Sequence, residues 1–197
     1  AIATLASRKL FDVTDADGVD NISDRNKQYC EVTGIYWAWK NDTADYIGFS
    51  HYRRRFCLDA KALAVISSDI VDLVVTEPIL NFAGVKAQYE KDHVLDDWIV
   101  LIDAIRECAS EYLDAALEVE KGIYYYAYNM FIMKRGVFDS YCRFVFPILD
   151  YCDKRIGKRD DPYQGRYAGF LCERLLTIFL EKNQEYTVAI ADKTFVE

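Results

Sequence analysis

Short apolar runs that alternate with amphipathic helical patterns constrain this chain more than any other feature of its sequence. Apolar or β-branched runs predict strands at Ala1–Thr4, Asp45–Ser50, Ile70–Val75, Ile123–Met133 and Thr187–Ala191. Apolar residues spaced three and four apart predict helices over Ser23–Lys40, 60–67, Val94–Val119, Phe138–Cys152 and Arg166–Glu181. This alternation predicts an α/β fold, with a mainly parallel sheet flanked by helices.

The bulk composition sets the protein class and excludes several others. At 197 residues, with 52% hydrophobic residues, the chain is expected to form a single domain over 1–197. The net charge of -8 argues against a general nucleic-acid partner, because such domains are normally basic. No apolar run approaches the roughly 18 residues of a membrane span. Six cysteines without a C-x-x-C pair are typical of reduced thiols, so a cytoplasmic protein is expected.

The His51–Arg55 cluster (His-Tyr-Arg-Arg-Arg) directly follows a predicted strand. Ligands of such sheets bind at the carboxyl ends of strands, which also directs attention to Thr76–Pro78 and to the region of Asn129. Arginine is always charged and can bind a phosphate through two parallel hydrogen bonds. The alternative is a surface turn whose arginines pair with nearby carboxylates. The position at a strand end favours an anion site.

Three polar residues elsewhere are candidates for binding or catalysis. Asn129 lies within an apolar run and must find partners, either a sugar hydroxyl or backbone groups. Glu173 shares a helical face with Arg166 and Gly169, where it could act as a catalytic base or form an intrahelical ion pair. A glycine inside a helix costs stability, which indicates close approach by another group. His93 precedes a long predicted helix and could act as a base near neutral pH or have no catalytic role.

Acidic residues in predicted loops give weaker signals. Asp20 and Asn21 precede a helix and could simply form a turn and a cap. Glu31 lies off the apolar stripe of its helix, so exposure is expected. Acidic pairs occur at Asp15/Asp17, Asp96/Asp97 and Asp160/Asp161. None of them directly follows a predicted core strand, so the sequence leaves the metal question open.

Taken together, the motifs resemble a family with an uncharacterised domain. They run in order along nearly the whole chain: Asp20-Asn21-Ile22-Ser23, Tyr29-Cys30-Glu31-Val32-Thr33, Tyr36–Asn41 (YWAWKN), Tyr46-Ile47-Gly48, His51-Tyr52-Arg53-Arg54, Asn129–Met133 (NMFIM), and Gly169-Phe170 followed by Glu173-Arg174-Leu175. Members of that family occur in bacterial capsular and exopolysaccharide gene clusters and are described as glycosyltransferases. More distantly, the family resembles the GT-A fold of nucleotide-sugar enzymes. The resemblance implies a Rossmann-like sheet, a nucleotide-sugar donor and a saccharide or lipid-linked acceptor.

Two departures from the family pattern have consequences. Members usually open with a strand, then His-Lys and a Pro-rich loop, whereas here Ala1–Thr4 is followed at once by Leu5. We therefore expect a missing loop between residues 4 and 5. GT-A enzymes also commonly carry Asp-x-Asp where this chain has His51-Tyr52-Arg53. Since these side chains could neutralise a diphosphate directly, the resemblance leaves dependence on a divalent cation (Mn or Mg) in doubt.

The resemblance implies a hexosyltransferase of surface polysaccharide assembly with a UDP-linked donor. From their places at predicted strand ends and in the matched motifs, we expect Arg53, Arg54 and His51 to neutralise the diphosphate, Asp20, Asn21 and Glu31 to lie near the nucleoside or sugar, and Asn129 to contact the donor sugar. Glu173 is the expected general base, with His93 and Asp97 as rivals. The alternatives are a non-catalytic nucleotide- or carbohydrate-binding module and a scaffold subunit of an assembly complex. Peripheral association with the inner face of the membrane, the oligomeric state, the sugar, the acceptor and the linkage stay open.

Overall fold

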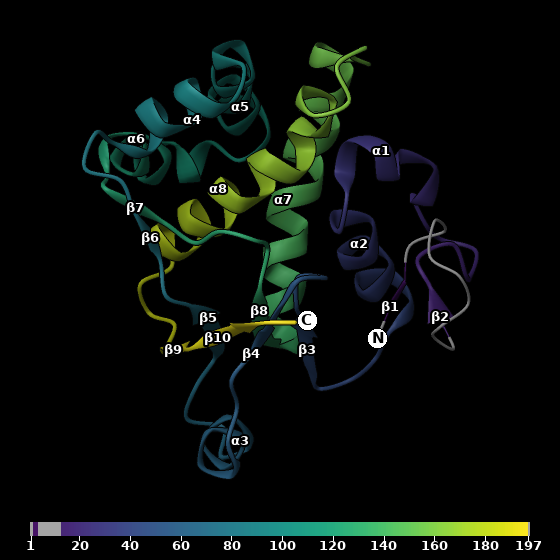
Figure 1. The fold of residues 1–197 in the computed structure, drawn as a ribbon, viewed down its shortest axis with the longest axis vertical. Helices are drawn as coiled ribbons and strands as arrows, with labels where there is room; N and C mark the ends of the chain where they lie inside the picture. Colours follow the sequence, from purple (N-terminus) through teal and green to yellow (C-terminus); the bar gives the residue numbers. More distant parts are fainter. Residues whose placement is uncertain (1, 4–12, 197) are drawn as a thin grey trace.

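The computed structural model describes residues 2–3 and 13–196, and its centre is a four-stranded sheet (Figure 1). The strand order is β3 (Tyr46–Phe49), β8 (Phe131–Lys134), β5 (Leu73–Thr76) and β9 (Val188–Ala191). β8 pairs antiparallel with both β3 and β5, and β5 pairs parallel with β9. The α/β class is therefore confirmed, but the prediction of a mainly parallel sheet is wrong.

The direction of β8 follows from where the intervening helices pack. A parallel sheet requires a helix that crosses back over the sheet between successive strands. Between β5 and β8 the chain instead forms α4 (Val85–Asp92), α5 (Leu95–Cys108) and α6 (Leu113–Lys121). These helices pack on one another and on α7 and α8, away from the strands (Figure 1). The chain thus re-enters the sheet at the same edge where β5 left it, so β8 runs antiparallel to β5. Alternating hydrophobicity does not encode that direction.

One face of the sheet packs against α7 (Arg135–Ile156) and α8 (Tyr167–Lys182), which lie above the strands in Figure 1. Successive residues of a strand point to opposite faces, and in β8 Phe131 and Met133 are buried whereas Ile132 and Lys134 are partly exposed. The ring of Phe138 on α7 lies 6.0 Å from that of Phe131. The core therefore lies between this face and the long helices.

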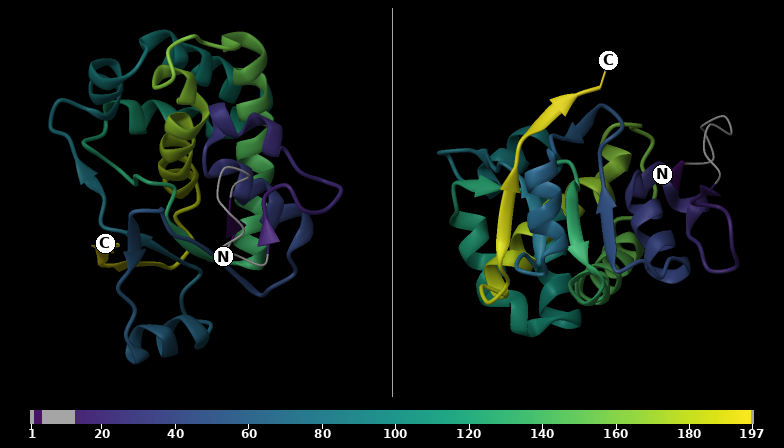
Figure 2. Two further views of the ribbon diagram at one scale, coloured as in Figure 1. Left: turned by 45° about the vertical axis from the view of Figure 1, so that its right-hand side comes forward. Right: turned by 90° about the horizontal axis from the view of Figure 1, so that it is seen from below.

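The opposite face of the sheet carries α3 (Ala60–Ser67), as the view from below shows (Figure 2). This helix matches the prediction over 60–67, and Asp59 caps it by accepting a hydrogen bond from the Ala62 amide at 2.7 Å. Just before it, β4 (Arg54–Phe56) pairs antiparallel with β10 (Lys193–Phe195). Part of the His51–Arg55 cluster is thus held in a two-stranded ribbon.

The remaining elements are short. They are β1 (Ile2–Ala3), β2 (Val13–Thr14), α1 (Asn26–Tyr29), α2 (Val32–Asn41), β6 (Ile79–Leu80), β7 (Tyr124–Tyr125) and 3₁₀ turns at Ser23–Arg25, Ser110–Tyr112 and Gln164–Arg166.

Three predicted elements are interrupted where the backbone takes special conformations. The helix predicted over Ser23–Lys40 breaks at Cys30, with φ of 51°. The helix predicted over Val94–Val119 breaks at Ala109.

The strand predicted over Ile123–Met133 breaks at Tyr128 and Asn129, with φ of 73° and 51°. Positive φ is uncommon outside glycine, and it costs free energy that the surrounding structure must offset. Because such positions cluster at functional sites, the positive φ angles of Cys30, Tyr128 and Asn129 mark them as candidate site positions.

The amino-terminal predictions are tested only in part. β1 confirms a strand at Ile2–Ala3, and it pairs parallel with β2. The missing loop expected between residues 4 and 5 lies outside the described residues. Within the described ranges, none of the helices combines the length and the apolarity needed to cross a membrane.

Candidate functional site

The ends of all four strands meet at one edge of the sheet. The register pairs Phe131, at the start of β8, with both Phe49 and Val75, and it pairs Thr76 with Ala191. The segments that follow β3, β5 and β9 therefore lie at the same edge as the segment that precedes β8. The three regions singled out in the sequence do share this edge, although Asn129 reaches it at the start of an antiparallel strand. We call the side chains gathered there the strand-end cluster: Glu31, His51, Arg54, Tyr128, Asn129 and Glu173.

Neighbouring side chains hold Arg54 in place, and its guanidinium forms no salt bridge with a carboxylate among the described residues. Its guanidinium carbon lies 4.0 Å from the centroid of the Tyr128 ring and 5.0 Å from that of Phe195. Its Nη1 lies 3.2 Å from Nδ1 of His51, and its backbone pairs with Phe195 in the β4–β10 ribbon. Guanidinium packs well on aromatic faces and keeps its in-plane donors available. Arg54 is thus a preorganised cation at the sheet edge.

The other two arginines of the His51–Arg55 cluster, Arg53 and Arg55, are exposed. Arg53 lies over the ring of Tyr52, with 4.8 Å between its guanidinium carbon and the ring centroid. Within residues 2–3 and 13–196, none of Arg53, Arg54 and Arg55 forms a salt bridge. The surface-turn alternative, in which these arginines pair with nearby carboxylates, is therefore not what the structure shows. The positive charge is available to a ligand.

His51 is uncharged in this setting. Burial, together with the positive charges of Arg54, Arg53 and Arg166, lowers the pKa of His51 to about 4. At neutral pH its ring is therefore a hydrogen-bonding group beside the arginines. The sequence-based assignment of His51 to the diphosphate is modified accordingly: it supplies no charge while the site has no ligand.

Asn129 and Tyr128 tie two acidic residues to the same edge. The Asn129 amide donates to Glu31 Oε1 at 2.8 Å and to the Gly169 carbonyl at 3.3 Å. The Tyr128 backbone N–H donates to Glu173 Oε1 at 2.8 Å. The left-handed backbone of both residues turns these donors toward the helices. Asn129 itself is 1% exposed, so it positions Glu31 instead of facing an open site.

Glu173 is a carboxylate with a perturbed titration. Burial raises the pKa of Glu173, and the nearby Glu31 raises it too, against the opposing effects of Arg174 and the Tyr128 N–H. Its Oε2 accepts from Arg174 Nη1 at 2.7 Å, so the ion pair that the sequence also allowed is present. A carboxylate whose pKa is shifted toward neutrality beside unpaired arginines is a candidate for proton transfer.

A close helix contact joins α8 to the Cys30 turn. A Cβ added to Gly169 would lie 3.5 Å from Cys30 Sγ, an ordinary van der Waals distance, so the Cys30 turn packs against this glycine but does not require it. Arg166 donates from Nε to the same sulfur at 3.0 Å. Glu31 directly follows Cys30, and the Asn129 amide bonds both Glu31 and the Gly169 carbonyl, so the turn brings Glu31 beside α8. Arg166 is therefore an arginine adjacent to the strand-end cluster.

Asp20 and Asn21 lie in a loop along α2. Asp20 Oδ1 accepts from the Tyr36 hydroxyl at 2.8 Å. Asn21 accepts from the Ser23 backbone N–H at 3.3 Å and donates to the Gly18 carbonyl at 3.1 Å. These are the turn-forming bonds of the simpler interpretation. No hydrogen bond among the described residues joins either side chain to the strand-end cluster.

The side chains of His93 and Asp97 contact other groups than those of the strand-end cluster. The His93 ring stacks on Phe170, with 4.0 Å between centroids, and burial lowers the pKa of His93 to about 4, helped by the charge of Arg174. Asp97 is buried and receives two hydrogen bonds from the guanidinium of Arg159. His93 is thus a stacked ring and Asp97 is part of an ion pair, and among the described residues neither side chain forms a hydrogen bond with the strand-end cluster.

Several site residues were not assigned from the sequence. Tyr128 packs on Arg54, and Arg174 contacts Gln88 and the rings of Tyr89 and Tyr125. These contacts are long-range, so local patterns do not reveal them. Arg166 did carry a signal, because it shares a helical face with Gly169 and Glu173. In the described part of the chain, no group of three or more His, Cys, Asp or Glu residues could hold a metal ion.

Fold and site together define a glycosyltransferase-like α/β domain. The chain belongs to the family described as a domain of unknown function, DUF4422, which matches residues 3–184. It is similar to the apo structure of the WbbM bifunctional glycosyltransferase, with a TM-score of 0.83 and 26% identity. That match covers 94% of this chain and 39% of the WbbM chain, so this chain spans well under half of that protein. No curated protein matches this chain.

Proposed function

We propose that this chain is the donor-binding domain of a glycosyltransferase. It moves a hexosyl unit from a UDP-linked sugar to a saccharide or lipid-linked acceptor in capsular or exopolysaccharide assembly. The observation that carries the proposal is that Arg53 and Arg54, which form no salt bridge with other described residues, lie at the same sheet edge as the perturbed carboxylate of Glu173. The similarity to WbbM supports the reaction class. A lipid-linked acceptor would bring the domain to the inner face of the membrane.

In this proposal the arginines stabilise the leaving diphosphate. Negative charge develops on the diphosphate as the glycosidic bond breaks, and fixed guanidiniums stabilise it without reorganising. His51 adds a hydrogen bond beside Arg54. A divalent cation would need oxygen ligands, yet the position of the usual Asp-x-Asp holds an imidazole, a phenol and a guanidinium. This donor set does not fit Mn²⁺ or Mg²⁺, and the proposal includes no step through a metal.

The acidic residues of the cluster take separate roles. Glu173 accepts the proton of the acceptor hydroxyl, since burial has raised its pKa toward the pH at which it must work. Glu31, held by the Asn129 amide, binds a hydroxyl of the donor sugar. Asn129 acts through Glu31, because it is itself buried. Asp20 and Asn21 are engaged in their own loop and receive no catalytic role.

The first test is calorimetric titration of the whole chain with UDP, in the presence of Mn²⁺ and then of EDTA. We expect saturable binding with a Kd of about 1 mM or tighter, which is a standard free energy of about -4 kcal/mol or better, and no loss of affinity in EDTA. ADP titrated in the same way is the control for base selectivity. No binding of UDP at millimolar concentration would favour the scaffold alternative. Binding without sugar transfer to any of a broad set of acceptors would favour a binding module.

A further inference from the structure

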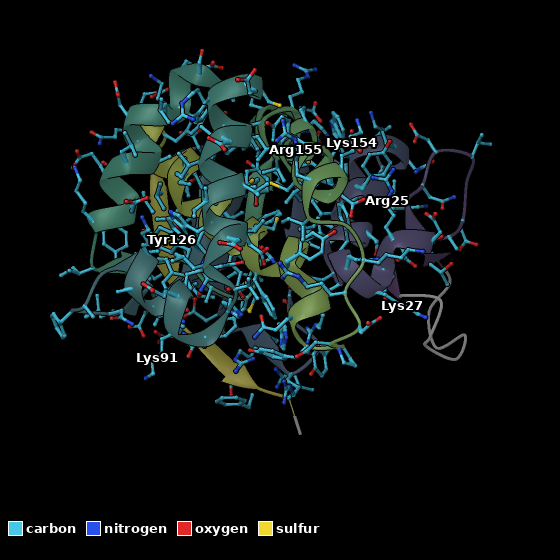
Figure 3. The ribbon with its side chains drawn as sticks, turned by 90° about the horizontal axis from the view of Figure 1, so that it is seen from above. Arg25, Lys27, Lys91, Tyr126, Lys154 and Arg155 are labelled. Carbon is cyan, nitrogen blue, oxygen red and sulfur yellow. The ribbon has the colours of Figure 1, made fainter. Side chains whose placement is uncertain are left out.

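A polar cavity lies directly beside the strand-end cluster, between α1 and the segment 158–166 that leads into α8. Its volume is about 720 Å³, which falls within the roughly 300–1,000 Å³ of ligand pockets. In Figure 3, Lys27 lies on the α1 side of this space, across from the light-green segment before α8. The lining residues are Asp24, Lys27, Gln28, Lys158, Arg159, Asp160, Asp161, Pro162, Gly165 and Arg166.

Most of the polar side chains around the cavity have no hydrogen-bond or salt-bridge partner in the part of the chain that the structure describes. Arg159 is bound to Asp97, and Asp161 accepts the backbone N–H groups of Tyr163 and Gln164. The side chains that form no hydrogen bond or salt bridge with one another or with other described residues are Asp24, Lys27, Gln28, Lys158 and Asp160. The cavity thus offers unengaged donors and acceptors together.

This mixture selects a chemical class of ligand. A sugar hydroxyl both donates and accepts a hydrogen bond, so a wall that presents cations, carboxylates and an amide can satisfy it. The cations of the lining (Lys27, Lys158, Arg159 and Arg166) are interspersed with the carboxylates Asp24, Asp160 and Asp161, so the cavity lacks the concentrated positive charge that a diphosphate needs. Apart from Pro162, the apolar surface of the lining comes from the stems of polar side chains, so a lipid chain would have to lie against charged groups. The lining therefore fits a saccharide.

Arg166 connects the cavity to the strand-end cluster. It lines the cavity, and its Nε donates to Cys30 Sγ at 3.0 Å. The residue after Cys30 is Glu31, which the Asn129 amide holds at 2.8 Å, and the neighbouring Tyr128 N–H holds Glu173. A ligand that extends from the cavity past Arg166 therefore approaches both acidic residues.

We propose that this cavity binds the acceptor saccharide, with Arg166 at the boundary between acceptor and donor. The inference rests on the proposed function, because it assumes that the nucleotide-sugar occupies the strand-end cluster. In the transfer step the acceptor hydroxyl oxygen bonds to the anomeric carbon and the bond from that carbon to the diphosphate oxygen breaks. Nucleoside diphosphate leaves with the electron pair, and the hydroxyl proton passes to Glu173.

The test uses the whole chain saturated with UDP and a set of methyl glycosides of glucose, galactose, mannose and N-acetylglucosamine. Amide chemical shifts are followed by NMR during each titration. We expect at least one glycoside to shift the amides of Gln28, Lys158 and Gly165 and to leave those of α6 unchanged. The variant Lys158→Ala with Asp160→Ala should weaken that glycoside about 10-fold or more and leave the UDP affinity unchanged. Both positions are exposed, so the fold should survive.

The matched control is Lys182→Ala, an exposed lysine at the far end of α8. It should change neither affinity. The inference is overturned if no glycoside binds while UDP does, if glycoside affinity is the same in the double variant, or if UDP itself shifts the cavity amides as its main site. Failure of UDP to bind at all would instead remove the proposed function. The two failures are therefore distinguishable.

Discussion

Replacing Glu173 with glutamine is expected to lower the rate of sugar transfer by about 10²–10⁴-fold, the usual contribution of a general base. Glutamine keeps the shape of the side chain and an oxygen that can still accept from the Tyr128 N–H. It cannot accept the proton of the acceptor hydroxyl. UDP affinity should change little, since the proposed diphosphate contacts belong to Arg53 and Arg54. The measurement is turnover of a UDP-sugar alongside UDP titration of the same preparation.

The pH dependence gives a second measurement on the same variant. Burial raises the pKa of Glu173, and a base acts only when it is deprotonated, so the wild-type rate should fall as the pH drops through that raised pKa. The Glu173→Gln variant has no such group, and its residual rate should lack this acid limb. A structural role alone would lower the rate without removing the limb.

The control for Glu173→Gln is Glu181→Gln on the same helix. Glu181 lies near the other end of α8, on the side of Tyr124 and Gln184, away from the strand-end cluster. It should leave turnover unchanged. Because Arg174 is 1% exposed and loses its charged partner in the Glu173 variant, thermal unfolding must be followed to show that the protein is folded at the assay temperature. Undiminished turnover by folded Glu173→Gln would remove Glu173 as the base.

Replacing Arg54 with alanine is expected to weaken UDP binding by about 10- to 150-fold. Hydrogen bonds to charged groups contribute about 1.5–3 kcal/mol, and each 1.4 kcal/mol corresponds to a factor of ten in Kd. Arg54 should reach this range because the Tyr128 and Phe195 rings and His51 already fix its guanidinium, so little side-chain entropy is lost on binding. Calorimetric titration with UDP measures the change.

Two further variants separate charge from packing at this position. Arg54→Lys keeps the charge but loses the planar fork and its stacking, so it should recover only part of the affinity. Arg143→Ala removes an exposed arginine of α7, far from the sheet edge, and should leave the Kd unchanged. If Arg54→Ala binds UDP as tightly as the wild type, the diphosphate role of Arg54 is wrong.

Much of the fold could be predicted from the sequence because local patterns encode it. The 60–67 helix and the strand ending before Ser50 match closely, since apolar spacing and β-branched content are local properties. The direction of β8 could not be predicted, because it depends on α4–α6 packing against α7, α8 and one another and not across the sheet. The breaks at Cys30, Tyr128 and Asn129 also escaped prediction, because long-range contacts hold non-glycine residues at positive φ.

In the candidate site, too, some features could be predicted from local sequence and others depend on long-range contacts. The His51–Arg55 cluster stood out because its charge follows a strand in an acidic chain. Asn129 stood out because an amide within an apolar run needs a partner, and that partner proved to be Glu31, 98 residues away. The stacking of Tyr128 on Arg54 and the pairing of Asp97 with Arg159 depend on tertiary structure alone. Residue type therefore indicated the candidates, and the structure decided which of them meet.

A crystal structure with UDP bound tests the central claim most directly. We expect the diphosphate oxygens within hydrogen-bonding distance, about 2.7–3.2 Å, of the guanidinium nitrogens of Arg53 and Arg54, with the nucleotide at the sheet edge. The Glu173 carboxylate should lie on the sugar side of that diphosphate. Ordered UDP elsewhere on the molecule, with both guanidiniums free of it, would contradict a nucleotide-sugar site at the strand-end cluster.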